Sequence, residues 1–293
     1  MPFSGELVHA AFIKWLGQAA PDVAAWLHEG HKRRLFTCSS LFFPRATQRF
    51  LSFERENTHI PLEPEKTYTL RLTLLLGDLF PLFYNALMSV NVSQLEAAGS
   101  PFLRLGKQFF LLEEIVLAND DRSGWTGFTS LSTLVEQARS LRPGAPASLT
   151  LEFASLTTFN RGTGRNGGLG SYPSLFPLPH LVFASLLKRW EDIAPPELAP
   201  LIQREQIEHY IQEQEGAIVV DYQLDAHHVH FTTHMQRGFV GTCTYQLRGS
   251  DEKPGEPDAL TVRQQVALLA QLAFYCGVGY KTAMGLGQVR LLS

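Results

Sequence analysis

The chain has 293 residues, 45% of them hydrophobic, and a formal net charge of −3 at pH 7. This length allows one large domain or two modest ones, each with its own core. No apolar run of about 20 residues is present, and the N-terminus lacks the basic start and apolar stretch of a signal peptide, so we exclude a membrane-spanning class and expect a soluble, cytoplasmic protein. The three cysteines, Cys38, Cys243 and Cys276, have neither metal-binding nor redox spacing, and we expect them to be reduced and mostly in the core.

Basic residues are concentrated in three windows that contain no Asp or Glu, namely residues 30–53, 153–190 and 259–293. Together these windows hold 12 of the 25 Lys and Arg residues. A nearly neutral chain with segregated basic segments suits a protein that presents one positive face to a phosphate backbone. The alternative is chance clustering of solvated surface charge.

Hydrophobic periodicity in the first part of the chain predicts two helices, with Pro21 at the start of the second, and then a zone rich in strands. The expected elements are helices over 7–16 and 23–27, strands over 35–43 and 68–76, a helix over 79–90 and a strand over 109–117. Residues 120–124 are typical of a turn. Residues 141–146 contain two prolines and a glycine in four positions, which stops any regular element and predicts a linker.

The second part of the chain predicts the order strand, helix, strand, strand, helix, strand. Its expected elements are a strand over 149–153, helices over 179–190 and 197–214, strands over 217–224 and 239–247, a helix over 262–273 and a final strand over 288–292. The first part has the same order without its leading strand. We therefore predict an α+β protein of two tandem ferredoxin-like (βαββαβ) domains, residues 1–142 and 147–293.

A glycine-rich turn follows the last helix, for which Asp258 or Thr261 is the expected N-cap. Two glycine pairs bracket Lys281 in this turn, and they are Gly277 with Gly279 and Gly285 with Gly287. Glycine allows a close approach of the backbone with its amide hydrogens turned outward, which favours an anionic ligand such as phosphate. The alternative is a plain tight loop. The spacing excludes both the dinucleotide fingerprint and a Walker loop.

A second basic segment lies between an expected helix and an expected strand, and it contains His28, His31, Lys32, Arg33 and Arg34. Histidine gains and loses a proton near neutral pH, and neighbouring cations stabilise the extra negative charge of a phosphorane. This combination suits RNA cleavage by the substrate's own 2′-hydroxyl without a metal. The alternative is that both histidines are residues favoured by the helix C-terminal dipole.

Two further segments are candidate binding sites for RNA or a metal. Residues 161–170 form a glycine and arginine loop, with Arg161 and Arg165, which either follows an RNA backbone or is an ordinary surface loop. Clustered histidines indicate either a metal site or polar, RNA-facing strand residues, and we favour the latter because only Asp225 stands near them as a further ligand. The cluster consists of His227, His228, His230 and His234.

Three places spread over nearly the whole chain are similar to one known family. They are the two glycine pairs, the segment of Leu27 and His28 followed by residues 35–37 and Ser39, and the segments 157–159, 176–177 and 237–241. On these residues the chain resembles the CRISPR repeat-cleaving endoribonucleases, the sixth of the CRISPR-associated proteins.

The resemblance implies two ferredoxin-like domains, with His28 as the catalytic histidine and Arg34 as a cation that assists the transition state. Some members of that family also use a tyrosine on the first helix. The matching place here falls near Ile13, so no tyrosine carries over, and Lys14 or His31 would substitute.

The activity implied is metal-independent cleavage of CRISPR precursor RNA within each repeat, with no cofactor, giving 2′,3′-cyclic phosphate and 5′-hydroxyl ends and a retained product. Expected partners are CRISPR repeat RNA and, in addition, effector-complex subunits or a second copy of the chain. One alternative is a catalytically inactive repeat-RNA-binding subunit, and another is a metal-dependent nuclease built on the histidine cluster. The residues expected to bind RNA are Arg33, Arg161, Arg165, Arg237, Gly277, Gly279, Lys281, Gly285 and Gly287.

Overall fold

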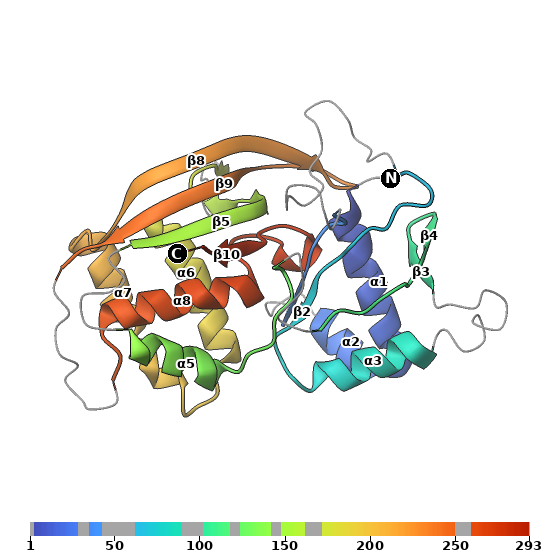
Figure 1. Cartoon of the computed structure of the whole chain (residues 1–293), viewed down its shortest axis with the longest axis horizontal. Helices are drawn as coiled ribbons and strands as arrows, with labels where there is room; N and C mark the ends of the chain where they lie inside the picture. The colour runs from blue at the N-terminus through green and yellow to red at the C-terminus, as the bar shows by residue number, and fades with distance from the viewer. Residues whose placement is uncertain are drawn as a thin grey trace, which may run out of the picture. The chain divides into compact units, whose positions relative to one another are not determined.

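The computed structural model describes residues 3–28, 35–42, 62–89, 102–117, 124–141, 148–161, 172–249 and 259–292 (Figure 1). The chain divides into two compact units. Unit 1 comprises Met1–Phe128 together with His230–His234 and Ala283–Gly285. Unit 2 comprises Thr129–Val229, Met235–Thr282 and Leu286–Ser293. The domain bounds expected from the linker, 1–142 and 147–293, stay a prediction.

The described part of unit 1 combines three helices with two small antiparallel sheets. Strands β1 and β2 pair with Thr37 opposite Thr73, and β3 and β4 form a hairpin that turns at Gly106, where φ is 63°. The described part begins at Phe3, just before α1, so no strand precedes α1 within it. The elements are α1 (Ser4–Ala19), α2 (Pro21–His28), β1 (Phe36–Cys38), β2 (Leu72–Leu74), α3 (Leu79–Ser89), β3 (Phe102–Leu105) and β4 (Gln108–Leu111).

The core of unit 1 forms where α1, α2 and α3 meet β1. Phe12 and Leu16 of α1 are buried against Leu27 of α2, and the rings of Phe12 and Phe36 lie 4.4 Å apart. Burial of each such side chain contributes about 2 kcal/mol. Because Leu27 is held in this core, the C-terminal end of α2 is held in place with it.

Unit 2 contains a four-stranded sheet in the order β10-β5-β9-β8 with helices on one side (Figure 1). Leu149, Leu151 and Phe153 alternate inward along β5 and are fully buried. The sheet and its covering helices are β5 (Ser148–Thr157), β8 (Ala217–His230), β9 (Met235–Leu247), β10 (Val289–Leu291), α5 (Leu131–Ser140), α6 (Pro179–Ile193), α7 (Arg204–Glu208) and α8 (Val262–Cys276). Shorter elements are β6 (Phe159–Arg161), β7 (Tyr172–Ser174), η1 (Ala199–Leu201), the π-helical η2 (His209–Glu213) and η3 (Thr282–Met284).

The order of β5, α6, β8, β9, α8 and β10 confirms the strand and helix order expected for the second part. Thr261 caps α8, since its hydroxyl accepts from the Gln264 amide while the Gln264 side chain accepts from the Thr261 amide. The α+β class is likewise confirmed.

Several expected elements differ from those observed. The helix expected over 197–214 is instead divided into η1, α7 and η2. Pro200 lies in the first turn of the short η1, where its missing amide hydrogen is tolerated, and α7 begins only at Arg204. The strand expected over 109–117 is instead the β3–β4 hairpin, with no strand over 112–117. Helix α5 was not expected, although Ser130 caps it by accepting from the Thr133 amide at 3.0 Å.

Candidate nucleic-acid interface

His28 is the last residue of α2, and its side chain is exposed. The helix forms here because Pro21 suits its first position and Asp22 complements the positive end of the dipole, while Ala24 and Leu27 lie on the buried face. The structure therefore presents this histidine to solvent on a packed helix, where a substrate can reach it.

The other expected catalytic residues, His31, Lys32 and Arg34, lie outside the described residues, as do Arg33 and Arg165. For Arg161 the structure describes the backbone, which ends β6 opposite Tyr172. Arg237 lies in β9 and is exposed. These residues stay predicted contacts.

A second histidine of unit 1, His9, was not singled out from the sequence. It is 6% exposed, its Nδ1 lies 2.9 Å from the carbonyl oxygen of Ala283, and its ring stacks on Phe36 at 5.5 Å. Its spacing from Phe12 and Leu16, three and seven positions further on, is the signal that places it on the buried face of α1. We assign His9 to the core.

The amides of the four glycines in the turn donate inside the chain. Gly277 donates to Ala273, Gly279 to Ser185 Oγ, Gly285 to Cys38 and Gly287 to Leu156. The expectation that these amides face outward toward an anion is therefore wrong. The glycines instead allow other backbone segments to come close to the turn. A Cβ on Gly279, where φ is 87°, would lie 2.5 Å from the Thr158 carbonyl oxygen.

The groups that the turn of unit 2 does present are Tyr280 and Lys281. Tyr280 is 40% exposed, and the Nζ of Lys281 lies 5.5 Å from the centroid of its ring. Lys281 has a φ of 57°, a left-handed conformation that non-glycine residues seldom adopt. The turn thus offers an aromatic ring and a cation, which is the chemistry of single-stranded nucleic-acid binding.

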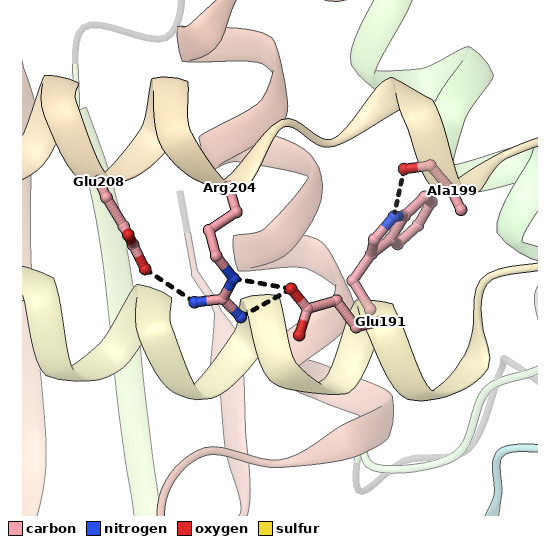
Figure 2. Close-up of polar contacts among 5 residues, drawn as sticks. Glu191, Ala199, Arg204 and Glu208 are labelled. Carbon is pink, nitrogen blue, oxygen red and sulfur yellow. Dashed lines mark hydrogen bonds and ion pairs between the residues drawn. The ribbon is translucent and has the colours of Figure 1, made fainter.

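Helix α6 contacts this turn through Ser185, and elsewhere along its length a charged hydrogen bond joins it to α7 (Figure 2). Arg204 donates to Glu191 of α6 and to Glu208 of α7, each at 2.7 Å. Burial, the largest single effect, lowers the pKa of Arg204, but its hydrogen bonds to Glu208 and Glu191 and their negative charges together raise that pKa above its ordinary value. In addition, Trp190 Nε1 donates to the Ala199 carbonyl at 3.4 Å.

The histidine cluster lies at the end of the hairpin formed by β8 and β9. The His234 ring stacks on Phe231 at 5.1 Å, and the Phe231 amide donates to the His234 carbonyl. Among the described residues, no group of three or more His, Cys, Asp or Glu side chains is arranged to hold a metal ion. Across all the residues that the structure describes, no helix is both long and apolar enough to cross a membrane.

Solved structures share this fold. A Cas6 product complex is 23% identical with a TM-score of 0.71, covering 100% of this chain and 95% of that chain. A second Cas6 product complex is 22% identical with a TM-score of 0.62, covering 100% and 94%. Thermus thermophilus Cas6 is 22% identical with a TM-score of 0.61, covering 98% and 91%. The fold defines the class: an α+β protein of two tandem ferredoxin-like domains.

Sequence comparison finds similarity to one family over part of the chain. Residues 151–289 match the family model of the CRISPR-associated endoribonuclease Cas6. A curated CRISPR-associated endoribonuclease Cas6 from Streptococcus thermophilus is 28% identical over 124 residues, which are 42% of this chain. The match spans 44% of that relative, less than half of its length. The similarity to Cas6 in sequence therefore covers somewhat less than half of this chain.

Proposed function

We propose that the chain is a metal-independent endoribonuclease that cleaves CRISPR precursor RNA within each repeat and retains the product. The observation that carries this proposal is the exposed imidazole of His28 at the end of a packed helix, in a chain whose residues 151–289 match the Cas6 family model. An exposed histidine at a fixed position is what a proton transfer with a bound substrate requires.

The proposed reaction uses the RNA as its own nucleophile. A base removes the proton of a 2′-hydroxyl, and the oxygen attacks the neighbouring phosphorus in line. The bond to the 5′-oxygen then breaks, and that oxygen takes a proton from an acid. The products are a 2′,3′-cyclic phosphate and a 5′-hydroxyl. His28 is proposed for one of the two proton transfers, and His31, Lys32 and Arg34 for the other transfer and for stabilising the phosphorane.

Binding of the repeat is proposed to rest on phosphate contacts from Arg33, Arg161, Arg165, Arg237 and Lys281. Such contacts position an RNA without reading its sequence. The four glycines contribute by permitting the backbone conformation of the turn, and their amides do not contact the RNA. A retained product suits transfer of the processed RNA to effector-complex subunits.

A gel assay tests this function. Repeat RNA is incubated with the protein in EDTA, and we expect one cut in each repeat. Full-length RNA that stays intact and tightly bound would contradict the proposal and favour an inactive RNA-binding subunit. Cleavage that EDTA abolishes would instead favour a metal-dependent nuclease.

A further inference from the structure

The glycine-rich turn of unit 2 is held on both sides of Tyr280 and Lys281. Before this pair, the Gly279 amide donates to Ser185 Oγ at 2.9 Å. After it, Arg189 Nη2 donates to Thr282 Oγ1 at 2.6 Å. The Tyr280 amide itself donates to the Thr158 carbonyl at 2.9 Å. The chain around the pair is therefore held at three residues, Gly279, Tyr280 and Thr282.

The two side chains that hold the flanks come from one face of α6. Ser185 and Arg189 are four residues apart, so they lie one above the other on the helix. Arg189 is 8% exposed and Thr282 is 1% exposed. Burying a guanidinium is costly unless it is hydrogen-bonded, so its use to hold Thr282, two residues from the exposed Tyr280, indicates that the position of the turn matters.

The backbone conformation of Lys281 also indicates that the position of the turn matters. A left-handed backbone at a non-glycine residue is strained and persists only where the surroundings determine it. A plain connection between α8 and β10 could place glycine at this position, as the turn already does at four others. The strain instead accompanies an exposed ring and a cation 5.5 Å from its centroid.

We propose that Tyr280 is a base-stacking residue for one unpaired nucleotide of RNA, and that Ser185 and Arg189 are the positioning residues that hold its ring in place. The inference deepens the proposed function and rests on it for the identity of the RNA. Lys281 takes the phosphate next to the stacked base. A ring that is already positioned loses less freedom on binding, which strengthens the contact.

The test measures binding of a fluorescent, single-stranded 12-nucleotide oligouridylate by anisotropy at about 50 mM salt, where unspecific phosphate contacts still hold RNA. We expect Tyr280→Ala to weaken binding by about 5- to 150-fold, the range for loss of one stacked base. Tyr280→Phe retains the ring and should bind like the unmodified protein. The matched control is Tyr222→Ala, which removes another exposed tyrosine of unit 2 and should leave binding unchanged.

A double-mutant cycle tests the positioning role, because a residue that acts through Tyr280 has nothing to position once the ring is gone. We expect Ser185→Ala and Arg189→Lys to weaken oligouridylate binding, and to have no further effect in the Tyr280→Ala background. Ser185→Ala is the milder change and serves alone if Arg189→Lys fails to fold.

Three results would overturn the inference: no binding of the oligouridylate by the unmodified protein, unchanged binding by Tyr280→Ala, or equal losses in both backgrounds of the cycle. The assay involves no cleavage and no repeat sequence. A protein that binds as expected here but leaves repeat RNA intact would refute the proposed nuclease while supporting the stacking site.

Discussion

The Nδ1 atom of His9 lies 2.9 Å from the carbonyl oxygen of Ala283 in the interior of unit 1. His28, at the end of the next helix, is exposed. One of the two histidines of the first two helices is thus committed to the core, and the other is available to a substrate.

We expect His28→Ala to reduce cleavage of repeat RNA by at least about 100-fold, the usual contribution of an acid or base, while binding and melting temperature stay unchanged. Cleavage is measured under single-turnover conditions and binding by gel shift. The matched control is His209→Ala, which removes an exposed histidine of unit 2 that bonds Glu213 at 2.8 Å. Normal cleavage by His28→Ala would remove this residue from the mechanism.

The nucleophile is tested on the substrate. A repeat RNA with a single 2′-deoxy nucleotide before the scissile phosphate should bind normally and remain uncut, because the attacking oxygen is missing. A deoxy nucleotide one position further from the scissile phosphate serves as control and should be cut. Cleavage of the first substrate would contradict attack by the 2′-hydroxyl.

Gly279→Ala should destabilise the protein by more than about 2 kcal/mol, because the added Cβ combines a positive φ with a clash against Thr158. Gly249→Ala separates the two effects. Gly249 has a similar φ of 89° with nothing within 4 Å of the added atom, so we expect a loss of about 1 kcal/mol. Urea unfolding of both variants gives the difference, and equal losses would disprove the close approach at Gly279.

Burial raises the pKa of the Cys38 thiol from 9.0 to about 12, against a smaller lowering by the Gly285 amide. Above pH 9 the thiol of the unfolded chain ionises while the folded one keeps its proton. The unfolded state then binds fewer protons, so the free energy of unfolding falls as pH rises from about 9 to about 12.

The Cys38→Ser variant tests this dependence, since a serine hydroxyl can donate to the Ala283 carbonyl as the thiol does, at 2.9 Å, but does not titrate in this range. We expect its stability to fall less steeply above pH 9, by up to about 1.4 kcal/mol per pH unit. Urea midpoints at successive alkaline pH values measure the slopes. Burial raises the pKa of Cys243 to about 11, and this thiol contributes equally in both proteins. Identical slopes for the two proteins would therefore contradict the raised pKa of Cys38.

The sequence by itself determined several local features of this protein. The cap of α8 at Thr261, the start of α2 at Pro21 and the order of strands and helices in the second part follow from hydrogen bonds and dihedral preferences within a few residues. The family motifs are local in the same sense. His28 could be singled out because it stands beside cations in one short segment.

Only the tertiary structure decided what the glycine-rich turn does. Its glycine amides bond Ser185, Cys38 and Leu156, which lie about 90 to 250 positions away in the sequence. No spacing within the turn indicates these acceptors. For the same reason neither the contact of His9 with Ala283 nor the hydrogen bond of Arg189 to Thr282 could be predicted. A contact between distant residues is created by the packing of whole elements rather than by the residues next to it.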